Sequence, residues 1–212
     1  MKEPTPQVVT RAGRAELEIR RSRFLATVYP CASAAEAESR LQESRAAHPK
    51  ATHHVWAWRL LDRSRGILER CDDDGEPGGT AGRPTLQVLQ ARAIVGAAVV
   101  TVRYFGGIKL GAGGLVRAYG AAANAALSDA HVREHVPLLR LRIKLPFPLL
   151  GSVESALGRE GAVVIGRRFD PEPELLCEVP RGRVKALGDL LGELGAGRIS
   201  IEPLDVASGP GP

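Results

Sequence analysis

The chain has 212 residues, 44% of them hydrophobic and 25% charged, which is enough for a globular core in one large or two small domains. No apolar run approaches the roughly 20 residues that a bilayer span needs, and the N-terminus lacks a signal-peptide pattern, so we expect neither a membrane protein nor a secreted one. The three cysteines lie far apart without a Cys-x-x-Cys pair, which favours reduced thiols in the cytoplasm over disulfides or a zinc site.

The net charge of +5 is carried by the first part of the chain. Residues 138–212 hold 10 basic and 10 acidic residues, so the whole excess of positive charge lies within residues 1–137. A one-sided basic surface favours a polyanionic partner such as RNA. A surface that only keeps the protein soluble would give the same count.

The first part of the chain combines strand and helix patterns. Ser33 with Glu36 forms a capping box at the start of a helix, and Pro49 stops that helix. Period-2 runs and β-branched apolar runs predict strands. In chain order we expect a strand, turn and strand over 15–30, a helix over 33–48, a strand over 53–61, a loop over 71–84, a helix beginning near Pro84, a strand over 97–105 and a helix over 114–130.

The second part has a cleaner pattern. We expect a strand over 138–146, a helix over 148–160, strands over 161–169 and 174–180, a helix over 181–195 and a strand over 198–204. This βαββαβ order is that of the ferredoxin-like split. The predicted fold class is therefore α+β, with one domain over 1–137, a ferredoxin-like domain over 138–206 and a disordered tail over 207–212.

Glycines crowd the junction between the strand over 97–105 and the following helix. A glycine loop before a helix presents free backbone N–H groups, which suits a phosphate or another anion. Neither a P-loop nor a dinucleotide-binding motif is present, so glycines that only permit close packing and positive φ remain the alternative. The candidate anion-binding residues are Arg103, Gly106, Gly107, Lys109, Gly111, Gly113, Gly114 and Arg117. We expect this loop to wrap the N-terminal end of the helix.

An acidic loop precedes the predicted helix at Pro84. Asp73, Asp74 and Glu76 could hold Mg²⁺, but the spacing of a calcium or magnesium loop is absent, and we predict no metal site and no cofactor. Such turn acids are more often solvated or paired with arginines. We expect this loop and the glycine loop to lie side by side.

Three aromatic residues are candidates for stacking on nucleic-acid bases. Trp56 and Trp58 share one face of their predicted strand, and Tyr104 ends the strand before the glycine loop. A buried aromatic pair is the alternative for the two tryptophans. The sequence shows no nucleophile paired with a base.

Four segments in this order, "RSRFLATV", "HHVWAWRL", "DDDGEPGGTAGRP" and "RYFGGIKLGAGGLVRAY", closely resemble the IMPACT/YigZ family. The resemblance implies an N-terminal domain of the α+β type found in ribosomal proteins, elongation factors and small-molecule kinases. It also implies a C-terminal domain similar to the last domain of translocation elongation factors. Eukaryotic relatives regulate translation by binding a protein partner of a stress kinase.

Two positions differ from the family pattern. Gly78 and Ala112 stand where relatives usually carry hydroxyl side chains, so a hydroxyl nucleophile or magnesium ligand at either position is excluded. We therefore predict a non-enzymatic cytoplasmic binding protein that acts around translation and contacts RNA, the ribosome or a translation factor. An enzyme acting on a small phosphorylated substrate is one alternative, and a protein–protein adaptor is another.

Overall fold

The computed structural model describes residues 5–62 and 66–204 and divides into two compact units, between His135 and Val136. The division lies at the boundary that the sequence predicts near residues 136–137. The predicted disordered tail, 207–212, lies outside the described residues.

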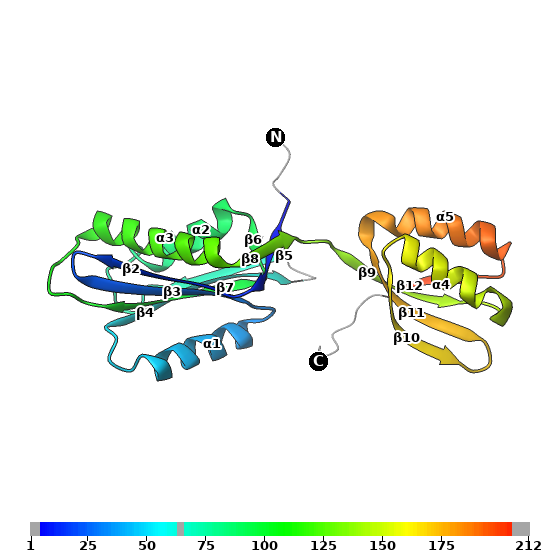
Figure 1. The fold of residues 1–212 in the computed structure, drawn as a ribbon, viewed down its shortest axis with the longest axis horizontal. Coiled ribbons are helices and arrows are strands. Elements are labelled where there is room, and N and C mark those ends of the chain that lie inside the picture. Colours follow the sequence, from blue (N-terminus) through cyan, green and yellow to red (C-terminus); the bar gives the residue numbers. More distant parts are fainter. Residues whose placement is uncertain (1–4, 63–65, 205–212) are drawn as a thin grey trace. The chain divides into compact units, whose positions relative to one another are not determined.

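The N-terminal unit is built on a five-stranded antiparallel sheet in the order β2-β3-β7-β4-β5 (Figure 1). Its strands are β2 (Gly13–Ile19), β3 (Ser22–Pro30), β4 (His53–Asp62), β5 (Gly66–Asp72) and β7 (Ala97–Tyr104). A small second sheet joins β6 (Ile94–Val95), β1 (Gln7–Arg11) and β8 (His131–Glu134).

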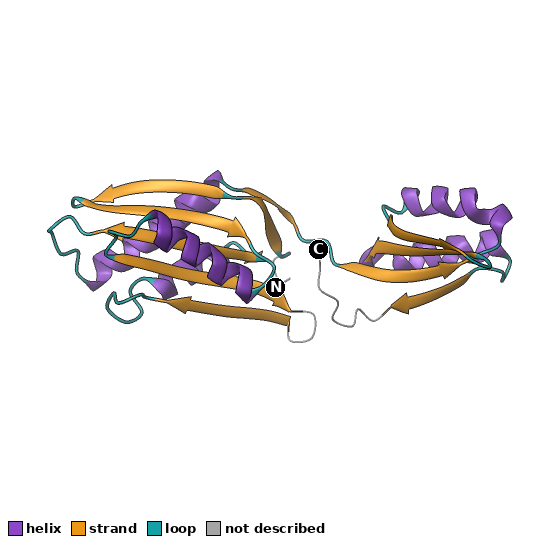
Figure 2. Cartoon of the chain, turned by 90° about the horizontal axis from the view of Figure 1, so that it is seen from below, coloured by secondary structure: helices purple, strands orange, loops and turns teal. Residues whose placement is uncertain are grey.

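Helices cover both faces of the large sheet. The helices are α1 (Ala34–Ala47), α2 (Gly82–Ala91) and α3 (Ala112–Asp129). α2 and α3 lie on one face and α1 lies on the other, which explains why β7 between them is an apolar run with both faces buried (Figure 1). Figure 2, seen from the α1 side, shows strand surface left uncovered beside α1.

Ser33 caps α1 as predicted, but Glu36 bonds to the residue before the cap and not to the N–H of Ser33. The Ser33 hydroxyl accepts the N–H of Glu36 at 3.2 Å, and the Glu36 carboxylate accepts the N–H of Ala32 at 2.8 Å. The helix ends at Ala47, two residues before Pro49. Local chemistry therefore sets both ends of this helix.

The C-terminal unit has the predicted βαββαβ order. Its elements are β9 (Leu138–Lys144), α4 (Leu150–Arg159), β10 (Val163–Phe169), β11 (Pro173–Pro180), α5 (Val184–Gly195) and β12 (Ser200–Leu204). The antiparallel strands run in the order β10-β11-β9-β12, and both helices pack on one face through a core that includes Leu141, Leu157 and Leu187 (Figure 1).

Several details of the N-terminal unit differ from the sequence prediction. The sequence does not predict the small sheet of β1, β6 and β8, whose strands are only two to five residues long. It does not predict β5 either, because this edge strand is exposed or half-buried and lacks a clear apolar alternation. α3 begins at Ala112 and not at Gly114, because the helix tolerates glycines in its first turn.

Candidate functional site

The glycine loop connects β7 to the N-terminal end of α3, as predicted. The N-cap residue is Gly111, whose φ of 73° lies in the region that favours glycine, and no side chain caps the helix. The first helical bond runs from the N–H of Leu115 to the carbonyl of Gly111 at 2.9 Å. The N–H groups of residues 112–114 therefore have no acceptor within the helix.

The β2–β3 turn packs directly against this loop. A Cβ atom added at Gly106 would lie 2.0 Å from the carbonyl oxygen of Arg21, so only glycine permits this contact. Arg20 and Arg21 form the turn with φ values of 47° and 64°, where an Asn-Gly pair is usual. Both side chains are exposed, so the strained turn presents two cations beside the glycine loop.

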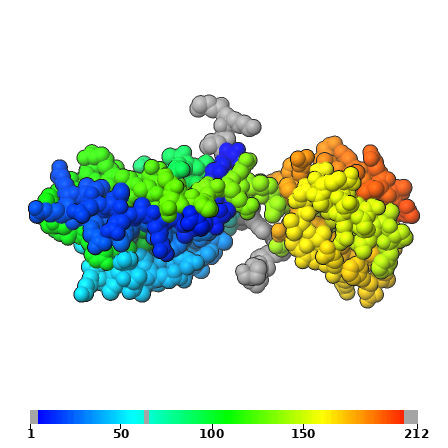
Figure 3. Space-filling view, in the orientation of Figure 1, coloured from blue at the N-terminus to red at the C-terminus, as the bar shows by residue number. Residues whose placement is uncertain are grey.

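Four exposed cations surround the start of α3. They are Arg20 and Arg21 in the turn, Lys109 in the glycine loop and Arg117 in α3. One guanidinium nitrogen of Arg117 lies 3.6 Å from the position that a Cβ at Gly113 would occupy. Within residues 5–62 and 66–204, none of the four side chains makes a hydrogen bond or an ion pair. Figure 3 shows the blue β2–β3 segment and the green segment around α3 meeting at one end of the N-terminal unit.

Most carboxylate oxygens of the acidic loop are bonded to neighbouring groups of the protein. The Asp73 carboxylate accepts the N–H groups of Gly79, Ala81 and Gly82 at 2.7, 2.9 and 2.8 Å. Burial alone would raise the pKa of Asp73, but the three N–H donors outweigh it and hold the pKa below its ordinary value. Asp73 thus fixes the turn that leads into α2.

Asp74 and Glu76 join the loop to other elements. The Asp74 carboxylate bonds to the Arg45 guanidinium and to the N–H of His54, each at 2.5 Å. One oxygen of Glu76, Oε1, accepts from both Arg103 and Tyr119 at 2.6 Å. Burial, followed by the hydrogen bond to Glu76, raises the pKa of Tyr119. The phenol therefore stays protonated and donates to the carboxylate.

The interpretation of Arg103 as a phosphate contact is wrong. Its side chain is 6% exposed and bonds to Glu76 at 2.6 Å and to Ser22 at 3.3 Å. It also lies between the rings of Phe24 and Phe105, with its guanidinium carbon 5.4 and 5.5 Å from their centroids. A buried cation with a carboxylate partner cannot neutralise an external phosphate, so Arg103 is a structural residue.

The acidic and glycine loops lie side by side, as expected, and share a pocket of about 420 Å³. Its polar lining residues are Thr52, His53, Glu76, Arg103 and Lys109. Its remaining lining residues are Pro77, Phe105, Leu110, Gly111, Ala112 and Leu115. The pocket is thus mostly apolar, with a few polar groups at defined positions.

His53 is a site residue that the sequence did not indicate. β4 pairs with β7 so that His53 lies opposite Arg103, and both side chains reach the shared pocket. The Nδ1 atom of His53 lies 2.7 Å from the carbonyl of Asp74, so Nδ1 carries the proton, and Nε2 lies 3.8 Å from Oε2 of Glu76. Strand alternation separates His53 from His54, but only the register between strands reveals its partner.

Comparison with known proteins identifies the family. The model of the Impact N-terminal domain matches residues 20–127, which include both loops. The IMPACT family member YvyE of Bacillus subtilis is 32% identical over 92% of this chain and 88% of its own length. The chain belongs to the IMPACT family.

Other IMPACT relatives extend the similarity across both units. The family member YigZ of Escherichia coli is 32% identical over 87% of this chain and 90% of its own length. A crystal structure described as that of a hypothetical protein superposes with a TM-score of 0.70 at 28% identity, covering 97% of this chain and all of that one.

The three stacking candidates of this IMPACT chain lie away from the pocket. By strand alternation they belong to the α1 face of the sheet, whereas His53 and Arg103 belong to the α2–α3 face. Trp58 packs on a buried cluster, Trp56 is half-buried, and the Tyr104 hydroxyl bonds to His48 at 3.0 Å. The tryptophans therefore support packing on this face and do not extend the glycine-loop site.

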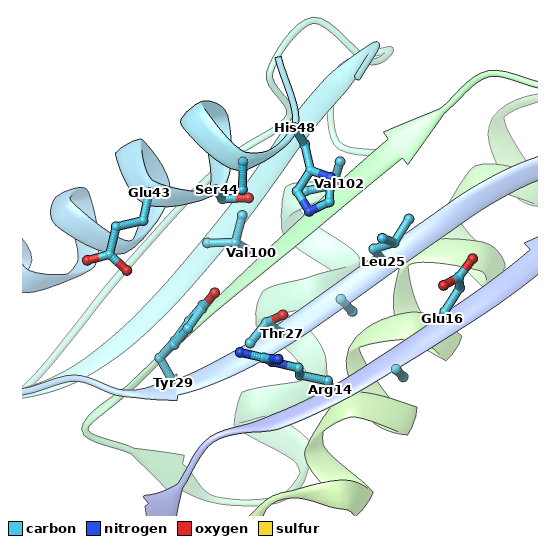
Figure 4. A pocket seen from close by; sticks show the side chains of 13 residues that line it. Arg14, Glu16, Leu25, Thr27, Tyr29, Glu43, Ser44, His48, Val100 and Val102 are labelled. Atoms are coloured by element: carbon cyan, nitrogen blue, oxygen red, sulfur yellow. The ribbon is translucent and has the colours of Figure 1, made fainter. Parts of the chain in front are cut away.

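A larger hollow of about 600 Å³ lies on the α1 face between α1 and the β2–β3 hairpin (Figure 4). Its two glutamates are already paired, Glu16 with Arg23 at 2.7 Å and Glu43 with Arg40 at 2.9 Å. It contains neither family loop, so we place the candidate site at the smaller pocket. No described helix is long and apolar enough to cross a membrane, and no three His, Cys, Asp or Glu side chains converge as metal ligands among the described residues.

Proposed function

We propose that this IMPACT chain is a non-enzymatic RNA-binding protein that acts around translation, and that the N-terminal unit supplies the phosphate contacts. The observation that carries the proposal is the group of four exposed cations without acidic partners, Arg20, Arg21, Lys109 and Arg117. These cations surround a helix start whose first N–H groups have no acceptor within the helix. Cations and free N–H groups at one end of a domain are the usual means of holding phosphates.

The C-terminal unit offers a contrast. Three cations of its sheet, Arg140, Arg142 and Lys144, are paired with glutamates, whereas Arg168 makes no ion pair among the described residues. Arg140 contacts Glu178 at 2.9 Å, and Arg142 contacts Glu174 at 3.4 Å and Glu202 at 3.2 Å. Because these charges are neutralised within the sheet, we expect this unit to contribute little to polyanion binding.

Fold-level analogy adds the link to translation. The strand order β10-β11-β9-β12 is that of ferredoxin-like domains, and we infer a C-terminal domain of the elongation-factor type. Ribosomal RNA or a translation factor bound to RNA is then the expected partner, in the cytoplasm. Analogy of fold supports this part of the proposal, and the site does not.

An enzyme acting on a small phosphorylated substrate is the second candidate, because His53 and Glu76 meet in the pocket. Glu76 is a poor general base, since Arg103 and Tyr119 both donate to its Oε1. Among the pocket residues, the one hydroxyl, Thr52, accepts the N–H of Phe105 at 3.1 Å and makes no hydrogen bond to His53. We therefore place binding ahead of catalysis.

The experiment titrates the full chain with single-stranded RNA at two salt concentrations. We expect the affinity to fall steeply as salt increases, because phosphate contacts release counterions. Absence of RNA binding at low salt would overturn the proposal. Turnover of a phosphorylated small molecule would favour the enzyme, and capture of a protein partner after ribonuclease treatment would favour the adaptor.

A further inference from the structure

The pocket beside the glycine loop is lined by a carboxylate whose second oxygen accepts no hydrogen bond from the described residues. The Glu76 side chain is 3% exposed, and both of its hydrogen bonds go to Oε1. Nε2 of His53 lies 3.8 Å from Oε2, which is beyond hydrogen-bond distance. Oε2 is not one of the buried polar atoms that lack a partner, so it stays open to the pocket, where a ligand that donates can reach it.

A second acceptor lies beside the first. In neutral His53 the proton is on Nδ1, because the carbonyl of Asp74 can only accept. Nε2 then carries a lone pair and faces the same space as Oε2 of Glu76. Two neighbouring acceptors suit a ligand with two adjacent N–H donors.

The remaining walls of the pocket are flat and apolar. Phe105 is 46% exposed and lines the pocket together with Pro77, Leu110 and Leu115. An aromatic ring beside aliphatic side chains suits a planar heterocycle, because bases of single-stranded RNA stack on such surfaces. The pocket of about 420 Å³ is within the size range of small-ligand sites.

The charge around the pocket decides whether the ligand that donates to these acceptors is neutral or cationic. Arg103 already neutralises Glu76, and Lys109 lines the rim, so an arginine or lysine side chain of a partner would meet net positive charge. A neutral base attached to phosphates fits both the acceptors and the cations. Guanine is the common base with two adjacent donors on its pairing edge, N1–H and the 2-amino group, whereas adenine, cytosine and uracil place an acceptor beside each donor.

We infer that this pocket binds one guanine base of a single-stranded RNA. Glu76 Oε2 and His53 Nε2 accept from the base, and Phe105 stacks on it. The inference rests on the proposed function, because the surrounding cations hold the phosphates of the same strand. It adds sequence preference to a surface that would otherwise bind any RNA.

The test compares RNA hexamers of uridine that carry a single guanosine, inosine or adenosine at one central position. With the full chain, we expect the guanosine hexamer to bind at least about five-fold tighter than the adenosine hexamer. The inosine hexamer lacks the 2-amino group and should therefore show only part of the gain in affinity over the adenosine hexamer. The salt dependence should be the same for all three, because the base contributes no counterion release. Equal affinity for the three hexamers would overturn the inference while leaving salt-dependent RNA binding intact.

Single-residue variants test whether the preference for guanosine arises in this pocket. Phe105→Ala should weaken guanosine-hexamer binding by about five-fold or more through lost stacking, whereas Phe147→Ala removes another exposed phenylalanine, from the C-terminal unit, and should have no effect. Glu76→Gln turns Oε2 into a donor and should abolish the preference. If that variant does not fold, Phe105→Ala still decides the matter. An unchanged preference in Phe105→Ala would contradict the inference.

Binding of nucleosides, which carry no phosphate, tests the guanine pocket independently of RNA binding by the surrounding cations. Guanosine without phosphate should bind and adenosine should not, and this result could hold even if the hexamers showed no salt-dependent binding. Preferential binding of N-acetyl-arginine amide over guanosine would overturn the inference and indicate a protein partner instead.

Discussion

The carboxylate of Glu76 lies 2.6 Å from the guanidinium of Arg103, and both side chains are almost completely buried. This pair connects the acidic loop, which contains Glu76, to β7, which leads into the glycine loop. The family motifs are therefore joined through the interior of the N-terminal unit. Oε1 of Glu76 is taken up by this pair, whereas Glu76 also lines the pocket beside the glycine loop.

Replacement of Arg103 should strongly destabilise the N-terminal unit. Arg103→Met leaves Glu76 buried without its cation, which typically costs about 3–5 kcal/mol of unfolding free energy. Arg142→Met is the matched control, because its exposed pairs should contribute less than about 1 kcal/mol. Urea unfolding of both variants measures the difference. Equal small losses in the two variants would show that the buried pair is not needed for stability.

The acidic loop should make stability depend on pH. The folded pKa of Asp73 is depressed, so its contribution is complete above the ordinary aspartate pKa of about 3.9 and is lost as pH falls from there through the lower folded pKa. Asp73→Asn should therefore flatten the stability curve below about pH 4. The control is Asp189→Asn, whose side chain is 67% exposed. Thermal unfolding across this pH range is the measurement, and identical curves for wild type and Asp73→Asn would contradict the assignment.

The contact between the glycine loop and the β2–β3 turn predicts opposite effects for two glycines. Gly106→Ala places a methyl group against the carbonyl of Arg21 and should destabilise the protein. Gly120→Ala adds a methyl group to the interior of α3, with nothing within 4 Å, and should stabilise it by about 0.5–1 kcal/mol. Chemical denaturation gives both values. A stable Gly106→Ala protein would mean that the turn and the loop separate in solution.

Much of the secondary structure could be predicted from the sequence because local signals determine it. Ser33 and Glu36 cap α1, and the alternation over residues 138–146 and 174–180 sets two central strands of the C-terminal sheet. The arrangement of the site could not be predicted, because it depends on the register that places His53 opposite Arg103. A charge count also treats a buried arginine as if it were exposed, so the sequence alone places Arg103 among the phosphate contacts.

The arginines of the β2–β3 turn should lower the stability of the protein and strengthen its binding to RNA. Arg20→Asn with Arg21→Gly supplies the residues preferred at two positive φ angles and should stabilise the protein by about 1 kcal/mol or more. The same change removes two exposed cations and should weaken RNA binding. Melting temperature and RNA affinity, measured on the same variant, test both effects. A gain in stability with unchanged RNA affinity would remove the turn from the binding surface.

The most direct test of RNA binding by the N-terminal unit is the salt dependence of two matched double variants. Lys109→Ala with Arg117→Ala removes two of the unpaired cations, whereas Arg159→Ala with Lys185→Ala makes the same change of charge in the C-terminal unit. For single-stranded RNA, the slope of log affinity against log salt should fall by about 1.4 in the first variant and stay unchanged in the second. Equal slopes in both variants would contradict the account.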